Sequence, residues 1–136
     1  MANRKLFCEV VSPERIVYSG EADMVVAHGI EGELGIMPQH IPIVTPLEIG
    51  ELRVKNDDGQ VYIAACGGYL EFRDDKLTVL ADAAEVSSQI DVARAEAKRL
   101  EREKEVAEAK ASGEKLLEAE ISLRKALLRL RVAQRD

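Results

Sequence analysis

The 136-residue sequence lacks an apolar stretch long enough to cross a membrane. A membrane-spanning helix needs ~18 or more consecutive apolar residues, and no window approaches that length. The first five residues, MANRK, are not followed by the apolar core of a secretory signal peptide. We therefore expect no direct membrane insertion, and we expect any membrane association to depend on a partner protein.

Cysteine and histidine are also scarce, with two of each. Cys8 and Cys66 lie in alternating apolar runs, a setting typical of inert buried thiols, and this favours a reducing compartment. His28 and His40 have no cysteine beside them, so the sequence predicts no metal site. Glycine spacing fits neither a Walker loop nor a dinucleotide fingerprint, and the two histidines yield no convincing Ser-His-acid set. These absences argue against an enzyme.

The net charge of -6 conceals a difference between the two parts of the chain. Residues 1–90 carry 7 Lys+Arg and 15 Asp+Glu, a charge of -8, whereas residues 91–136 carry 12 and 10, a charge of +2. The acidic part argues against a nucleic-acid partner. The cationic tail, which includes Arg124, Lys125, Arg129 and Arg131, indicates an acidic or phosphate-bearing partner.

Residues 1–86 have the pattern of a small β domain. Short runs alternate apolar and polar residues, and glycine or proline recurs between them. Asp57, Asp58 and Gly59 mark a hairpin turn, and the pair Gly67-Gly68 predicts a bulge or a corner where the chain passes from one sheet to another. We expect a β-sandwich or flattened barrel of about eight to ten strands, in a fold that is mainly β plus α.

Residues 87–136 have a different pattern, rich in Ala, Glu, Lys, Arg and Leu and free of proline. Ser88 and Asp91 resemble a capping box, which places a helix start at residues 88–90. Ser112-Gly113 should end this helix, and a second should run to about Gln134, giving an antiparallel hairpin.

The two helices differ in their apolar content. The second has a wide stripe that includes Leu116, Leu123 and Leu130, whereas the best stripe of the first is mostly alanine. The members of the first stripe are Ala93, Ala97, Leu100, Ala107 and Ala111. Alanine contacts bury little area, so we expect closure of the hairpin to be worth only about a few kcal/mol. If the helices straightened into one line of about 40 residues, they would reach ~60 Å.

Four collinear segments together resemble the epsilon subunit of bacterial ATP synthase. They are GELGIMPQHIP at 32–42, GGYLE at 67–71, LTVLAD at 77–82 and IDVARA at 90–95. Each motif alone is weak, but four in order, joined to a β domain and a helical hairpin of suitable length, make the resemblance specific.

The resemblance implies a non-catalytic subunit of the central stalk, in the rotor. A ten-stranded sandwich would bind the gamma subunit and the c ring, where Glu33 and His40 match contact positions. The hairpin would either fold back or extend along gamma into the catalytic head, meet the alpha and beta subunits, and inhibit ATP hydrolysis. The location implied is the cytoplasmic face of the bacterial cell membrane, as a peripheral subunit. Without the resemblance, Glu33 and His40 are ordinary exposed loop residues.

The resemblance also implies ATP as a regulatory ligand of the folded hairpin. The matching positions are Glu85, Ile90, Asp91, Arg94, Ala95, Lys125 and Arg129. Lys125 departs from the family arginine, since an ammonium cannot make the forked phosphate contact of a guanidinium. Glu101 stands in place of a further arginine, with Arg99 and Arg102 beside it.

Other readings remain open from the residues alone. Asp91 could merely cap the helix, with Ile90 packed on the sheet and Arg94 solvated. The whole chain could be a free-standing interaction module that homodimerises through the second helix without binding nucleotide, although two heptads are short for a coiled coil. An enzyme with a pocket in the sandwich is a third reading, which lacks a convergent set of acid, base and nucleophile.

Overall fold

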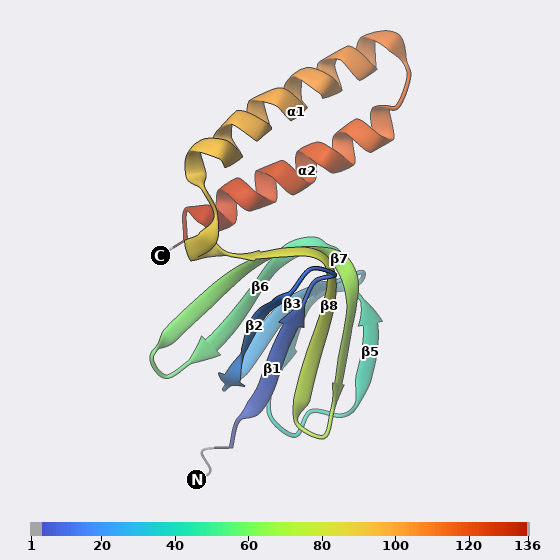
Figure 1. The fold of residues 1–136 in the computed structure, drawn as a ribbon. Coiled ribbons are helices and arrows are strands. Elements are labelled where there is room, and N and C mark those ends of the chain that lie inside the picture. The colour runs from blue at the N-terminus through green and yellow to red at the C-terminus, as the bar shows by residue number, and fades with distance from the viewer. Residues whose placement is uncertain (1–3, 136) are drawn as a thin grey trace. The chain divides into compact units, whose positions relative to one another are not determined.

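The structure is a computed structural model that describes residues 4–135. The chain divides into two compact units, one ending at Val86 and the next beginning at Ser87 (Figure 1). The first unit is made of eight strands. They are β1 (Leu6–Val11), β2 (Ile16–Ala22), β3 (Met24–Gly29), β4 (Gly32–Ile36), β5 (Ile43–Pro46), β6 (Ile49–Asn56), β7 (Gly59–Arg73) and β8 (Lys76–Val86).

The strands form the predicted sandwich because β7 and β8, the two longest strands, take part in both of its layers. Residues 59–66 of β7 pair with β6, whereas residues 69–72 pair with β5. One layer has the order β2-β1-β8-β7-β5, and the other has the order β8-β7-β6-β3-β4. All pairs are antiparallel except β1 with β8, which is parallel. The residue pattern predicted about eight to ten strands and the resemblance implied ten; residues 4–135 contain eight, of which β7 and β8 each belong to both layers.

The change of partner along β7 occurs at Gly67-Gly68, the pair that predicted a corner. Both glycines have positive φ, +72° and +107°. A Cβ on Gly68 would lie 2.0 Å from the carbonyl oxygen of Leu80 on the paired strand. No L-residue side chain fits there without separating β7 from β8, so the corner requires glycine.

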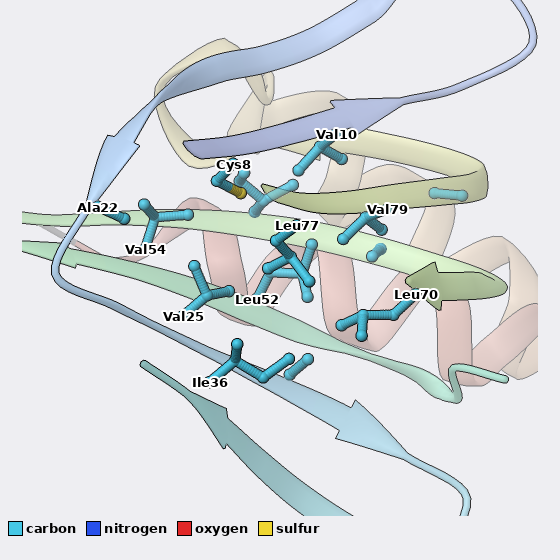
Figure 2. Packing of buried hydrophobic residues seen from close by; sticks show 14 of the residues in the cluster. Cys8, Val10, Ala22, Val25, Ile36, Leu52, Val54, Leu70, Leu77 and Val79 are labelled. Atoms are coloured by element: carbon cyan, nitrogen blue, oxygen red, sulfur yellow. The ribbon is translucent and has the colours of Figure 1, made fainter. Parts of the chain in front are cut away.

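Alternate residues of the strands fill one apolar core between the layers. Figure 2 shows side chains from both layers pointing toward one another, among them Val25, Leu52 and Leu77, which are at most 2% exposed. Cys8 is completely buried in this core, and burial raises the pKa of its thiol to about 12. Cys66 is also buried, so both cysteines are the buried free thiols that the sequence indicated.

The second unit is an antiparallel pair of helices preceded by a short turn. A 3-10 turn (η1, Ser87–Gln89) leads into α1 (Val92–Ser112), and α2 spans Leu116–Ala133. Asp91 caps α1 by accepting a hydrogen bond from the backbone N–H of Arg94 at 3.1 Å, and Gly113 ends α1 at φ +75°. The predicted start at 88–90 was wrong by two or more residues, because Asp91 and not Ser88 is the capping residue.

The alanine stripe assigned to the first helix was also wrong. Its members are exposed, and the side chains buried on α1 are Ala95, Val106 and Ala109. Alanine occurs on both sides of α1, so spacing alone could not identify the packed face. The rest of the helix is solvated and crossed by ion pairs, including Arg99 Nη1 to Glu103 at 2.9 Å. On α2 the buried side chains are Ala126, Leu128 and Val132.

Candidate functional site

A cationic pocket lies in the groove between α1 and α2. It has a volume of about 350 Å³. Its lining residues are Lys98, Arg102, Ser122, Lys125, Ala126 and Arg129. Two cations come from each helix, and each pair is spaced i,i+4, which puts its members on one helical face. The pocket therefore gathers four positive charges from two elements, with no carboxylate in its lining.

The ion pairs of the α1 cations leave donors for a ligand. Arg102 holds Glu105 through Nη1 alone, at 2.8 and 3.0 Å. Lys98 Nζ lies 3.7 Å from a Glu101 carboxylate oxygen, too far for a hydrogen bond. Their side chains are 46% and 30% exposed, so both cations reach solvent beside the pocket.

The residues predicted to bind nucleotide fall into three places. Lys125 and Arg129 line the cationic pocket. Ile90, Asp91, Arg94 and Ala95 lie together at the start of α1, where Ile90 and Ala95 are buried and the other two are exposed. Glu85 is half-buried on β8 of the first unit, paired with Ala64 of β7.

Sequence reasoning did not identify Lys98 as a pocket residue. The signal was present, because Arg94, Lys98 and Arg102 follow one another at i,i+4 spacing along α1. Arg99, which lies near the position where Glu101 replaces a family arginine, does not line the pocket and is ion-paired with Glu96 and Glu103.

An apolar ridge crosses the outer face of the layer formed by β2, β1, β8, β7 and β5. Its members are cross-strand neighbours in register, so their side chains share one face. They are Ile16, Val11, Leu80, Tyr69 and Pro46. Ile16 and Tyr69 are each 58% exposed and Leu80 is 56% exposed. A contiguous exposed apolar surface of this kind is typical of a protein interface.

Glu33 and His40, the two predicted rotor-contact residues, lie on β4 and on the loop between β4 and β5. The Glu33 carboxylate is 3.3 Å from Arg53 Nη2 and 3.4 Å from His28 Nε2. The His40 ring makes an edge contact with Phe72 at a centroid distance of 6.0 Å. Both side chains are therefore held by neighbours on adjoining elements.

The loop that carries His40 is fixed by Asp75, at the turn between β7 and β8. One carboxylate oxygen of Asp75 accepts the backbone N–H of Gln39 at 2.6 Å, and the other accepts Arg4 Nη2 at 2.8 Å. The Arg4 hydrogen bond, followed by that from Gln39, holds the pKa of Asp75 below its usual value. Met37 and Ile41 of this loop are 55% and 74% exposed.

Over residues 4–135, no cluster of three or more His, Cys, Asp or Glu side chains has an arrangement that could hold a metal ion. Neither helix in the same range is apolar enough over a sufficient length to span a membrane.

Comparisons with known proteins agree on one family. A family model described as "ATP synthase, Delta/Epsilon chain, beta-sandwich domain" matches residues 5–87. The ATP synthase epsilon chain of Brevibacillus brevis is 51% identical over 105 residues, which cover 76% of this chain and 80% of that one. The ATP synthase epsilon chain of Halalkalibacterium halodurans is 45% identical over 130 residues, which cover 96% and 98% of the two chains.

A solved structure supports the fold over nearly the whole length. A chain in the Euglena gracilis mitochondrial ATP synthase, an OSCP/F1/c-ring assembly, superposes with a TM-score of 0.72 at 19% identity. The match covers 96% of this chain and 82% of that one. At this identity the likeness concerns the fold alone.

Proposed function

Because the chain belongs to the epsilon-chain family of ATP synthase, as a non-catalytic subunit of the central stalk, we propose that it couples the catalytic head to the c ring and regulates ATP hydrolysis. In this role the sandwich, residues 1–86, binds the gamma subunit and the c ring, and the hairpin, residues 87–136, is the regulatory element. The subunit is peripheral, on the cytoplasmic face of the bacterial cell membrane.

The apolar ridge is the observation that carries the proposed gamma contact. Tyr69 and Leu80 are neighbours on β7 and β8, and both are more than half exposed. Burying such side chains in an interface is worth about 25 cal/mol per Å² of apolar area. A rotor subunit has to transmit torque without slipping, and a ridge anchored across five strands of a rigid layer gives gamma a firm base.

The second contact of the sandwich is with the c ring. Glu33 supplies a negative charge that Arg53 and His28 hold in place, and the loop at 37–42 supplies exposed apolar side chains at Met37 and Ile41. We assign Glu33 and His40 to this contact. A polar rim beside apolar anchors is the usual composition of a protein interface.

The hairpin is suited to opening because the buried side chains of α1 are small. Ala95, Val106 and Ala109 are the buried residues of α1, so separating the helices exposes little apolar area. In the open form the helices extend along gamma toward the alpha and beta subunits and inhibit hydrolysis. Arg124, Lys125, Arg129 and Arg131 then meet acidic segments of the beta subunits, a contact that salt weakens.

ATP stabilises the closed form in this proposal. Arg94 and Asp91 contact the nucleotide at the start of α1, with Ile90, Ala95 and Glu85 completing the site, and Lys125 and Arg129 bind its phosphates. A ligand at 100 times its dissociation constant stabilises the state that binds it by ~2.7 kcal/mol. That is comparable with the weak helix interface, so nucleotide can decide which form prevails.

Two measurements test this function. Calorimetry of the full chain with ATP should give a binding heat that Arg94→Ala abolishes. This change leaves the helix cap intact, since Asp91 accepts from the backbone of residue 94.

In the assembled complex, truncation at Ser88 should raise ATP hydrolysis, and preincubation of the full-length form with ATP should do the same. Absence of heat at millimolar ATP, or hydrolysis unchanged by truncation, contradicts the corresponding part of the proposal.

A further inference from the structure

The loop between β4 and β5 contains a tight turn that its own residues disfavour. The backbone N–H of His40 donates to the carbonyl oxygen of Met37 at 3.1 Å, which closes a turn over residues 37–40. Pro38 fixes the second position of this turn at a negative φ, and Gln39 at the third position has a φ of +70°. This combination is that of a type II turn, whose third position is usually glycine.

Glutamine has a Cβ atom, so the left-handed conformation costs Gln39 free energy that glycine would not lose. For an L-residue this cost lowers the population of the left-handed conformation roughly 5- to 30-fold. Without support from outside the turn, residue 39 would therefore leave this conformation much of the time. The rest of the structure has to supply the stabilisation that the sequence of the turn lacks.

Asp75 supplies this support from the turn between β7 and β8. Its Oδ1 atom accepts the backbone N–H of Gln39 at 2.6 Å, so a charged acceptor bonds directly to the residue with positive φ. Its Oδ2 atom accepts from Arg4, at 2.8 Å from Nη2 and 3.2 Å from Nε. The Arg4 guanidinium therefore holds the carboxylate by one oxygen while the other oxygen holds the loop.

The turn determines how the exposed apolar side chains of the loop are presented. Met37 and Ile41 flank the left-handed residue and are 55% and 74% exposed. A change of φ at Gln39 would rotate these two side chains relative to each other, so they would no longer meet one partner surface together. Their arrangement thus depends on a carboxylate that lies 36 residues further along the chain.

We propose that Asp75 is the positioning residue of the c-ring contact: its carboxylate, held by Arg4, keeps Gln39 in the left-handed conformation and so fixes the loop that meets the ring. The inference rests on the contact between this loop and the c ring proposed above. It adds that the affinity of the contact depends on a residue that acts through the loop and not on the ring itself.

Rescue by glycine at position 39 tests this role. Asp75→Gly removes the carboxylate but keeps a residue that tolerates the positive φ of the β7–β8 turn. It should weaken binding of the full chain to a complex of the gamma subunit and the c ring about tenfold. Combining it with Gln39→Gly should restore the affinity to within about twofold of the wild type, because glycine adopts the left-handed conformation without support. Gln39→Ala removes the same side chain but keeps the conformational cost, so it should not restore binding.

Asp74→Gly is the matched control. Asp74 and Asp75 carry the same charge, lie in the same turn and both have a positive φ, +52° and +58°, but it is Asp75 that accepts the Gln39 N–H. Asp74→Gly should therefore leave the affinity for the complex within about twofold of the wild type. Affinity for the gamma subunit alone should be the same in all these variants, since gamma is assigned to the apolar ridge. Urea unfolding of each variant establishes that its sandwich is formed.

Hydrogen exchange in the free chain, measured by NMR, gives a second readout that does not involve the ring. The Gln39 N–H is bonded to Asp75, whereas the His40 N–H is bonded within the turn to Met37. Asp75→Gly should speed exchange at both amides. Adding Gln39→Gly should slow exchange again at residue 40 but not at residue 39, because the turn is restored and the carboxylate acceptor is not.

The outcomes separate this inference from the proposed function. Ring binding that Ile41→Ser weakens and Asp75→Gly leaves unchanged overturns the positioning role and keeps the ring contact. An equal loss in Asp75→Gly with and without Gln39→Gly also overturns the positioning role, because Asp75 then acts otherwise than through the turn. Ring binding that neither Ile41→Ser nor Asp75→Gly weakens overturns the proposed contact of the loop together with this inference.

Discussion

Replacing Tyr69, the one aromatic member of the apolar ridge, by serine should weaken binding of the gamma subunit about a hundredfold. An aromatic side chain carries ~200 Å² of surface, and Tyr69 is 58% exposed, so ~120 Å² is available to a partner. At ~25 cal/mol per Å² this area is worth ~3 kcal/mol, which corresponds to a factor of about 100 in the dissociation constant. The stability of the chain itself should change by less than about 0.5 kcal/mol, since the ring is largely solvated.

The assay is calorimetric titration of the gamma subunit with the wild-type chain and its variants, with urea unfolding of each variant alongside. Ile16 and Ile30 make a matched pair, because both are 58% exposed and only Ile16 belongs to the ridge. Ile16→Ser should weaken binding, and Ile30→Ser should not. Equal affinities of the wild type and Tyr69→Ser, or equal losses in the two isoleucine variants, would refute the assignment of the ridge to gamma.

Three further predictions concern the sandwich. Gly68→Ala should lower the free energy of unfolding, measured in urea, by ~3 kcal/mol or more, because the new Cβ would lie 2.0 Å from the Leu80 carbonyl oxygen. Gly59 also has a positive φ but has open space around the Cβ position, so Gly59→Ala should lower the same free energy by only ~1 kcal/mol. The pKa of Asp75 is lowered from its usual value of 3.8, so the ionised carboxylate stabilises the folded chain at pH values above 3.8. That contribution is lost as the pH falls through the folded-state pKa. The melting temperature should therefore drop more steeply below pH 3.8 in the wild type than in Asp75→Asn. With a pKa of about 12, the Cys8 thiol should resist iodoacetamide at neutral pH until the chain is unfolded, as mass spectrometry of the labelled protein can show.

The sandwich could be predicted because its signals are local and strong. Alternation places every second residue in the core, and Gly67-Gly68 marked the corner where β7 exchanges β6 for β5. What sequence could not give is the pairing of strands distant in the chain. The apolar ridge joins Ile16, Leu80 and Pro46 only through that pairing, so no sequence pattern contains it.

The helical unit was predicted less well because alanine carries little directional information. Spacing identified two helices and their break, but it selected Ala93 and Ala97 as the packed face where the structure buries Ala95 and Val106. Because the packed face of α1 was predicted wrongly, Lys98 was not predicted to lie in the groove: the cations that line the groove depend on which face of α1 packs against α2. The resemblance identified Lys125 on α2 as a candidate ligand contact, and only the structure shows that Lys98 and Arg102 of α1 line the same pocket.

Asp91 caps α1, and we propose that it also contacts nucleotide; the geometry of the cap leaves room for both roles. The Oδ1 atom accepts the backbone N–H of Arg94 at 3.1 Å, which caps α1. An ionised carboxylate has lone pairs on both oxygens, so Oδ2 remains able to accept from a ligand while the cap is kept. Loss of a cap costs about 1 kcal/mol, a sizeable fraction of the few kcal/mol expected for closure of the hairpin. Binding through Oδ2 avoids that cost, so a nucleotide at the start of α1 can stabilise the closed hairpin without first loosening the helix that it holds.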